Sequence, residues 1–261
     1  MVAPLGAPPH SSVTVHPFDV EATFSEDYLH FYAEVLGDER SDEDAASVIA
    51  LGGLTAGMAV LDAPCGHGRI AVRLAQLGMQ VVGVDQSEVF LTAARREAAA
   101  KGVDVEYVEG DLRRLPAGGP FDAVVCWFTS FGYFSDDQNR DVLREFRRAL
   151  RPGGQLLLET LSHDGYVRTF TEAPEAIVVD AGGDLMVDRN RFDAVAGCIV
   201  CHRVTVRAGV RKDARFFIRL PTFPEWRAWL ADAGFSSVSF CEPDGAPVDL
   251  DSWRIVVRAV A

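Results

Sequence analysis

From about residue 58 onward, short apolar runs alternate with amphipathic segments of helical spacing. The apolar runs are short and bounded by turn residues, as buried strands are. Segments with apolar residues three or four apart separate most of them and predict helices. Strands that alternate with helices predict an α/β fold with a parallel sheet. The predicted strands are 58–61, 80–84, 105–109, 123–127 and 155–160, and the predicted helices are 69–77, 87–102 and 135–152.

The two flanks of this region have different patterns. Before it, aromatic residues at helical spacing from Phe24 to Val35 predict one helix, and 42–54 predicts a second that closes at Gly52 and Gly53. After it, alternation of period two across 176–220 predicts three or four antiparallel strands. The last part predicts a helix at 223–235 and two strands, at 236–243 and 252–260.

The stretch VLDAPCGHGR, from Val60 to Arg69, indicates a strand, a tight turn and a helix. Gly66 and Gly68 carry no Cβ, so the backbone there can approach a ligand closely. The free N–H groups of the following helix would point at that ligand. The next predicted strand ends in Asp85, which is placed to accept hydrogen bonds from a ribose diol.

Two classes of cofactor fit this turn. GHGRIA, at 66–71, satisfies the dinucleotide pattern G-x-G-x-x-G/A, and a cofactor built from a nucleoside and an amino acid fits as well. Asp62 favours the second class, because its carboxylate would repel a pyrophosphate and attract an ammonium group. Asp111, after the third strand, suits the amino edge of an adenine.

As a set, an acid after each of three strands and the turn PGG at 152–154 resemble the class I S-adenosylmethionine-dependent methyltransferases. The resemblance covers about residues 58–161 and the end of the chain. It implies an α/β fold: a Rossmann-like, doubly wound, seven-stranded sheet with an N-terminal helical cap and a small inserted antiparallel sheet. Pro64 stands where that family usually has glycine, but DxPCGxGR loops are similar to a variant among small-molecule methyltransferases. The expected parts are the arm and cap (1–55), the cofactor-binding core (56–165), the inserted sheet as a lid (166–222) and the return to the core sheet (223–261).

The resemblance also implies a site. Asp85 would bind the ribose, Asp111 and Leu112 the adenine, and the hydroxyl of Tyr28 would reach the methionyl carboxylate. The full set expected to bind S-adenosylmethionine is Tyr28, Asp62, Ala63, Cys65, Gly66, Arg69, Asp85, Gln86, Asp111, Leu112 and Phe128.

Two residues are candidates for catalysis. His163 follows strand five and would act as a base, or else only cap a turn. Tyr133 would orient the nucleophile, or else only line the pocket. In the inserted sheet, Arg189 and Arg191 would either bind an acidic group or sugar hydroxyls, or be ordinary solvated residues.

The segment after strand four limits the classes of acceptor that the chain can methylate. Enzymes that methylate base amino groups typically carry Asp/Asn-Pro-Pro-Tyr/Phe there, where this chain has 126–129, CWFT. The aspartate of metal-dependent catechol methyltransferases is missing too, and Cys198 and Cys201 lack a second CxxC, so we expect no metal. FTSFGYF at 128–134, the DxPCGxGR loop and ETLSHDG at 159–165 together resemble bacterial small-molecule methyltransferases of secondary metabolism, such as lincosamide-type N-methyltransferases. Antibiotic biosynthesis is therefore the expected setting.

Bulk properties limit the partners. The net charge of −13 argues against nucleic acid, and no apolar run approaches the roughly 20 residues of a membrane span. Five scattered cysteines and a first segment without signal-peptide features predict a cytoplasmic protein. We expect methyl transfer from S-adenosylmethionine to an amine, or a hydroxyl, of a small polar metabolite, and a homo-oligomer stays open. The alternatives are an NAD-dependent oxidoreductase and a non-catalytic S-adenosylmethionine-binding protein.

Overall fold

The computed structural model describes residues 19–116, 118–170 and 176–261. A seven-stranded sheet forms the body, in the order β10-β11-β5-β4-β1-β2-β3. Strands β1 to β5 run parallel, and β11 is antiparallel to both β5 and β10. The α/β fold and its seven strands confirm the prediction. The strands are β1 (Ala59–Asp62), β2 (Gln80–Asp85), β3 (Glu106–Glu109), β4 (Phe121–Cys126), β5 (Leu150–Leu161), β10 (Ser237–Cys241) and β11 (Arg254–Val260).

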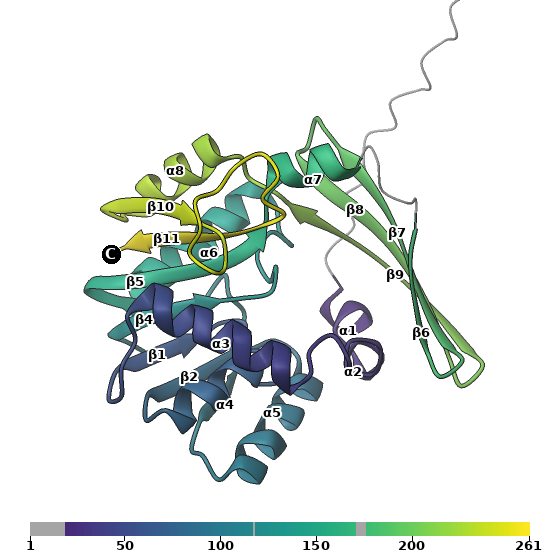
Figure 1. Cartoon of the computed structure of the whole chain (residues 1–261), viewed down its shortest axis with the longest axis horizontal. Helices are drawn as coiled ribbons and strands as arrows, with labels where there is room; N and C mark the ends of the chain where they lie inside the picture. The colour runs from purple at the N-terminus through teal and green to yellow at the C-terminus, as the bar shows by residue number, and fades with distance from the viewer. Residues whose placement is uncertain (1–18, 117, 171–175) are drawn as a thin grey trace, which may run out of the picture.

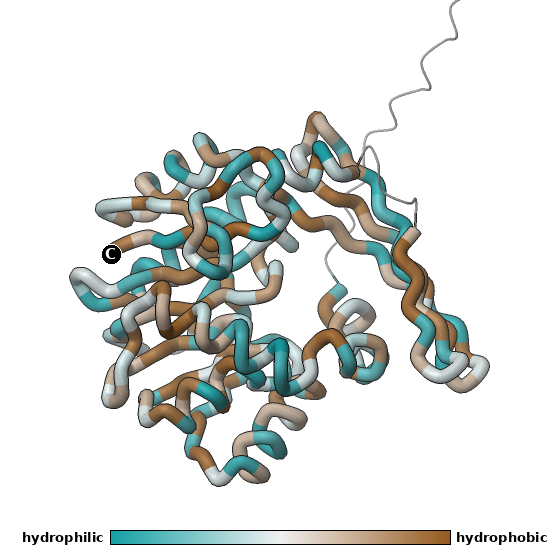
Figure 2. The backbone as a smooth tube through the Cα atoms, in the orientation of Figure 1, coloured by the Kyte–Doolittle hydropathy of each residue, from teal (hydrophilic) through white to brown (hydrophobic). Residues whose placement is uncertain are grey.

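Helices cover both faces of this sheet (Figure 1). On β1, Val60 packs into an apolar cluster with α3 and α4, whereas its neighbour Leu61 packs into a second cluster with α6 and α8. Successive side chains of a strand point to opposite faces, so one apolar run supplies both clusters. Figure 2 shows the resulting hydrophobic strands at the centre of the body. The helices are α3 (Asp38–Gly52), α4 (Arg69–Gln76), α5 (Glu88–Lys101), α6 (Asp136–Ala149), α7 (His163–Phe170) and α8 (Phe223–Asp232).

A second sheet of four antiparallel strands stands beside the body (Figure 1). It follows α7 in the chain and returns to the body at α8, as the alternation across 176–220 predicts. We call this sheet the lid. Its strands pair in sequence order and are β6 (Ala176–Ala181), β7 (Asp184–Asp193), β8 (Cys198–Arg207) and β9 (Val210–Arg219).

Two short N-terminal helices, α1 (Val20–Thr23) and α2 (Glu26–Phe31), lie between the body and the lid (Figure 1). Asp27 on α2 is buried and accepts hydrogen bonds from Arg207 Nη1 at 3.1 Å and Lys212 Nζ at 2.6 Å, both on the lid. On the other side, Ser87 Oγ donates to the carbonyl of Phe24 at 3.1 Å. These two helices therefore contact both the body and the lid.

Several element bounds differ from the sequence prediction. In place of the one helix predicted from Phe24 to Val35 there are two, α1 and α2; α2 ends at Phe31, and Val35 is 49% exposed in the turn that leads to α3. Gly37 is the N-cap of α3, which starts at Asp38, earlier than predicted. Helix α7 was not predicted; the Ser162 hydroxyl, which accepts from the Gly165 N–H at 3.2 Å, was the available local signal. No helix in the described part of the chain is long and apolar enough to cross a membrane.

Candidate active site

A cavity lies at the carboxyl ends of β1, β2 and β4, with about 830 Å³ of empty space when its open mouth is included. Most of the residues predicted to bind a cofactor line it, although they come from separate parts of the chain. The N-terminal cap and the turn after β4 complete its wall. The predicted residues among its lining are Tyr28, Asp62, Cys65, Gly66, Arg69, Asp85, Gln86, Leu112, Phe128 and Tyr133.

The loop after β1 is held by the end of β2. Asp85 accepts hydrogen bonds from the Gly66 N–H at 2.8 Å and the Ser87 N–H at 2.9 Å, one on each carboxylate oxygen. Gly68 has φ +81°, and a Cβ there would lie 2.4 Å from the hydroxyl oxygen of Tyr107, so this position requires glycine. An ionised carboxylate accepts about four hydrogen bonds, so Asp85 keeps acceptor capacity for a ligand.

Asp62 ends β1 and is 2% exposed. Its Oδ2 has no hydrogen-bond partner among the described residues. Burial raises the pKa of Asp62 to about 7, against the guanidinium of Arg69, which lowers it. A buried carboxylate with a free oxygen is a site for a cationic group of a ligand.

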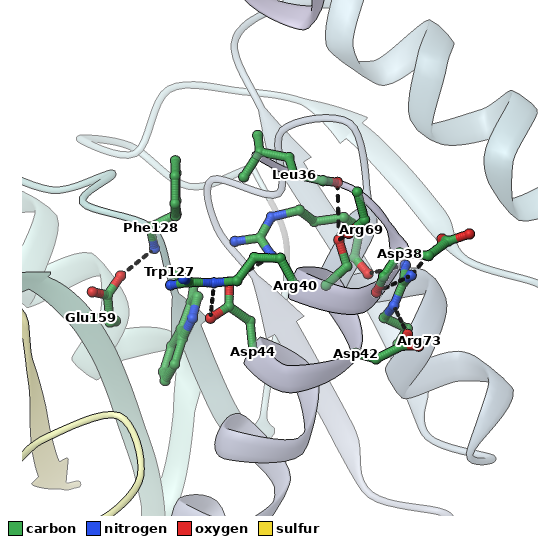
Figure 3. Close-up of polar contacts among 12 residues, drawn as sticks. Leu36, Asp38, Arg40, Asp42, Asp44, Arg69, Arg73, Trp127, Phe128 and Glu159 are labelled. Atoms are coloured by element: carbon green, nitrogen blue, oxygen red, sulfur yellow. Dashed lines mark hydrogen bonds and ion pairs between the residues drawn. The ribbon is translucent and has the colours of Figure 1, made fainter. Parts of the chain in front are cut away.

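Arg69, the first residue of α4, is held from two sides (Figure 3). Its Nη1 lies 2.7 Å from Oδ2 of Asp44 on α3, and its guanidinium carbon lies 5.2 Å from the ring centroid of Phe128. Nη2 is buried and has no hydrogen-bond partner in the described part of the chain. One turn further, Arg73 pairs with Asp38 and Asp42 of α3. Arg69 is therefore a fixed donor at the cavity, suited to an anionic group.

A second cavity lies between the lid and the body, with about 940 Å³ of empty space when its open side is included. Four aromatic residues line both cavities and so form their common wall: Phe24, Tyr28, Phe128 and Tyr133. The lid contributes apolar residues and the buried ion pair of Asp188 with Arg203, whose Nε and Nη2 reach the two carboxylate oxygens at 2.7 and 2.6 Å. Burial raises the pKa of the Tyr133 hydroxyl well above its usual value, so this group stays neutral.

The alternation of side chains along β7 decides which of its polar residues face this cavity. Asp188 and Asn190 line it, whereas Arg189 and Arg191 between and beyond them are exposed. Alternate residues of a strand face opposite sides, so these arginines are solvated residues of the outer face. Of the two roles that the sequence left open for Arg189 and Arg191, their position agrees with ordinary solvated residues and not with binding of an acceptor in this cavity.

Comparison with known proteins agrees with this geometry. Residues 60–154 match the family model described as a methyltransferase domain. A demethylmenaquinone methyltransferase of Renibacterium salmoninarum is 28% identical over 76% of this chain and 75% of its own length. The chain is an S-adenosylmethionine-dependent methyltransferase.

Solved methyltransferases share the fold over most of the chain. The CcbJ methyltransferase of Streptomyces caelestis is 25% identical, with a TM-score of 0.72 over 86% of this chain and 92% of that one. CalS10, an amino pentose methyltransferase of Micromonospora echinaspora, is 21% identical, with a TM-score of 0.64 over 90% of this chain and 96% of that one. The alternatives of an NAD-dependent oxidoreductase and of a non-catalytic binding protein are therefore wrong.

The first cavity of this methyltransferase fits S-adenosylmethionine. The free Oδ2 of Asp62 suits the ammonium group of the methionine moiety, and the free Nη2 of Arg69 suits its carboxylate. Asp85, with acceptor capacity left, suits the ribose hydroxyls, and Leu112 suits the adenine face. These assignments of single residues stay predictions.

Three predicted site residues do not line either cavity. Ala63 is fully buried, and its N–H donates to the carbonyl of Val125 at 2.8 Å. Asp111 forms an ion pair with Arg113 at 2.5 Å. His163 begins α7, and its Nδ1 lies 2.7 Å from Oδ1 of Asp164. Their predicted roles stay predictions, and these positions lend them no support.

The sequence argument missed part of the wall. Phe90 and Phe134 line the first cavity, and Asp188, Asn190, Arg203 and Phe216 bring the lid to the second. No spacing signal marks such residues, because their elements meet only in the folded chain. The described residues contain no group of three or more His, Cys, Asp or Glu side chains arranged to hold a metal ion.

Proposed function

We propose that this methyltransferase methylates an amine of a small-molecule acceptor bound beneath the lid. The observation that carries the proposal is the common wall: Phe24, Tyr28, Phe128 and Tyr133 line both the cofactor cavity and the lid cavity. The two cavities therefore adjoin at these residues, and an acceptor in the second cavity would reach the cofactor's reactive end there. The concave, partly apolar shape of the second cavity suits a small molecule.

The cofactor supplies an electrophilic methyl carbon on a sulfonium, and the chain's residues supply alignment. In-line attack needs two reactants at a fixed distance and angle, and alignment alone can lower the barrier substantially. The aromatic rings of the common wall also attract a cation, since their faces carry negative potential. Tyr133, which contacts the rings of Phe24 and Phe216 across the boundary, is the candidate that orients the nucleophile.

The chemistry of the lid cavity favours an amine over a hydroxyl. A hydroxyl must lose its proton to a base, whereas a neutral amine already has a lone pair. Among the described residues that line this cavity, the one carboxylate is Asp188, and Arg203 holds it in a two-point ion pair. Burial in a largely apolar cavity lowers the pKa of an amine, so the cavity itself favours the reactive neutral form.

Matched acceptors test the proposal. The protein is incubated with S-adenosylmethionine and pairs of cyclic primary or secondary amines and their hydroxyl analogues, and S-adenosylhomocysteine and methylated product are measured. We expect turnover of amines and none of the matched hydroxyl compounds. Methylation of the hydroxyl analogues alone would contradict the proposal.

Replacing His163 tests base catalysis separately. A true general base would contribute roughly 10²- to 10⁴-fold to turnover. Since the His163 side chain lines neither cavity, we expect His163→Ala to keep kcat within about threefold of the wild type. The measurement is kcat against pH for both proteins. A loss of about 100-fold or more, with unchanged cofactor affinity, would restore His163 as the base.

The biological setting is a further proposal. CalS10 is described as acting in calicheamicin biosynthesis, and its substrate class, an amino pentose, is an aminated small molecule. This supports a role for the present enzyme in secondary metabolism, including antibiotic biosynthesis. The narrower resemblance to lincosamide-type N-methyltransferases stays a prediction.

A further inference from the structure

The turn that follows β4 has an unusual backbone. Phe128 and Thr129 have φ values of +64° and +55°, in the left-handed region. Two consecutive residues there, neither of them glycine, asparagine or aspartate, are rare, and the branched Cβ of threonine makes its conformation especially unfavourable. Such a backbone persists only when its surroundings hold it.

Glu159, on β5, holds this turn. The side chain is fully buried, and its Oε2 accepts a hydrogen bond from the Phe128 N–H at 2.7 Å (Figure 3). The carbonyl oxygen of the same residue accepts from the Thr129 N–H at 3.2 Å. Glu159 therefore accepts a hydrogen bond from the N–H group of each of the two residues in the left-handed conformation.

Arg254, at the start of β11, completes the arrangement. Its Nε and Nη2 donate to the two carboxylate oxygens of Glu159, a two-point contact that only a guanidinium makes. A buried carboxylate is unfavourable without such a partner. Arg254 also contacts the Phe128 side chain, because its guanidinium carbon lies 4.8 Å from the ring centroid.

The Phe128 ring is where this arrangement acts. It belongs to the common wall of the two cavities, and Arg254 itself lines the lid cavity. If the turn relaxed to an ordinary backbone conformation, the ring would leave its place between the cavities, and the distance between the two reactants would change.

We infer that Glu159 and Arg254 are positioning residues for methyl transfer, which hold the Phe128–Thr129 turn in its left-handed conformation and so fix the wall between cofactor and acceptor. The inference rests on the proposed division into a cofactor cavity and an acceptor cavity. Because near-attack geometry is sensitive to small displacements, the pair acts on kcat more than on cofactor affinity.

A double-mutant cycle with Thr129→Gly tests this inference. Glycine adopts the left-handed conformation without a steric cost, so a turn with Thr129→Gly depends less on Glu159. We expect Glu159→Gln to lower kcat by a factor of about ten or more in the wild-type background. In the Thr129→Gly background, the factor by which kcat falls should be about three times smaller. Arg254→Lys, which cannot make the two-point contact, should resemble Glu159→Gln. An equal loss in both backgrounds would overturn the inference.

Glu225→Gln is the matched control. Glu225 is also an acid paired with a largely buried arginine, Arg219, at 2.5 Å, but it lines neither cavity. Glu225→Gln should lower the melting temperature, and its effect should be the same in the wild-type and Thr129→Gly backgrounds. If Glu159→Gln likewise changed only the melting temperature, the pair would be structural and the inference wrong.

A second readout needs no acceptor, so it separates this inference from the proposed function. Trp127 precedes the turn and is one of four tryptophans, so its ¹⁹F resonance in 5-fluorotryptophan-labelled protein can be assigned with Trp127→Phe. We expect Glu159→Gln to shift or broaden this resonance, and Thr129→Gly to reverse part of the change. An unaltered resonance in Glu159→Gln would contradict the inference, even if amine methylation is found. A shifted resonance with no amine turnover would contradict the proposed function alone.

Discussion

Asp85→Ala is expected to weaken the binding of S-adenosylmethionine by roughly 10- to 150-fold. The estimate corresponds to about 1.5–3 kcal/mol for hydrogen bonds to a charged acceptor. The Asp85 carboxylate binds both the protein and the ligand in this proposal. It accepts hydrogen bonds from the N–H groups of Gly66 and Ser87, and it has acceptor capacity left for the ribose hydroxyls. Isothermal titration calorimetry with S-adenosylmethionine and S-adenosylhomocysteine measures the loss.

Two control variants separate the ligand contact from the loop contact. Asp85→Asn keeps the shape of the side chain and one carbonyl oxygen but loses the charge, so we expect an intermediate loss of affinity. Asp104→Ala removes an exposed carboxylate elsewhere on the body and should leave affinity unchanged. If Asp85→Ala binds the cofactor as tightly as Asp104→Ala does, Asp85 is not part of the binding site.

The second large effect is a pH dependence of cofactor affinity that comes from Asp62. Burial raises the pKa of this carboxyl to about 7 in the free protein, so near neutral pH it is only partly ionised. A bound ammonium group favours the ionised form, so binding below that pKa releases a proton. Affinity should therefore rise with pH through about 7 and level off above it, with a slope approaching tenfold per unit on the acid side.

Calorimetry from about pH 5.5 to about pH 8.5 measures this dependence. Asp62→Asn cannot ionise, so we expect weak binding with a flat profile in the same range. The control ligand is 5′-methylthioadenosine, which lacks the amino-acid portion and should show no dependence in the wild type. Burial, together with Arg69 and Arg73, lowers the pKa of nearby His67 to about 4, below this range. The same slope for both ligands would show that Asp62 does not bind the ammonium group.

Local patterns were sufficient for much of this protein. The apolar runs of β1, β4 and β5 predicted a parallel sheet buried on both faces, because each run supplies side chains to both sides. The helix predicted at 135–152 is present as α6, and it starts at a capping box of Ser135 with Gln138, which satisfies N–H groups within one turn of helix. That Asp62, Gly66 and Asp85 lie together on one cavity was predictable, because strand ends of a parallel sheet meet at one edge.

The alternating pattern of the lid predicted its strands but not which face covers the body. A shift of one residue exchanges the two faces of a strand, and the docking of the lid decided that Asp188 and Asn190, rather than Arg189 and Arg191, face the acceptor cavity. Arg189 and Arg191 are therefore ordinary solvated residues, one of the two possibilities that the sequence left open.

The catalytic side of the site was decided by contacts between distant segments. His163 stands at the expected edge of the sheet, yet the turn of α7 leaves its side chain outside both cavities. Glu159 and Arg254 are 95 residues apart and meet because β11 pairs antiparallel with β5. Periodicity and capping report on interactions within a few residues, so the sequence by itself determined the fold and the cofactor edge. Only the tertiary structure, through long-range strand pairing and the packing of cap and lid, decided the wall at which the two reactants would meet.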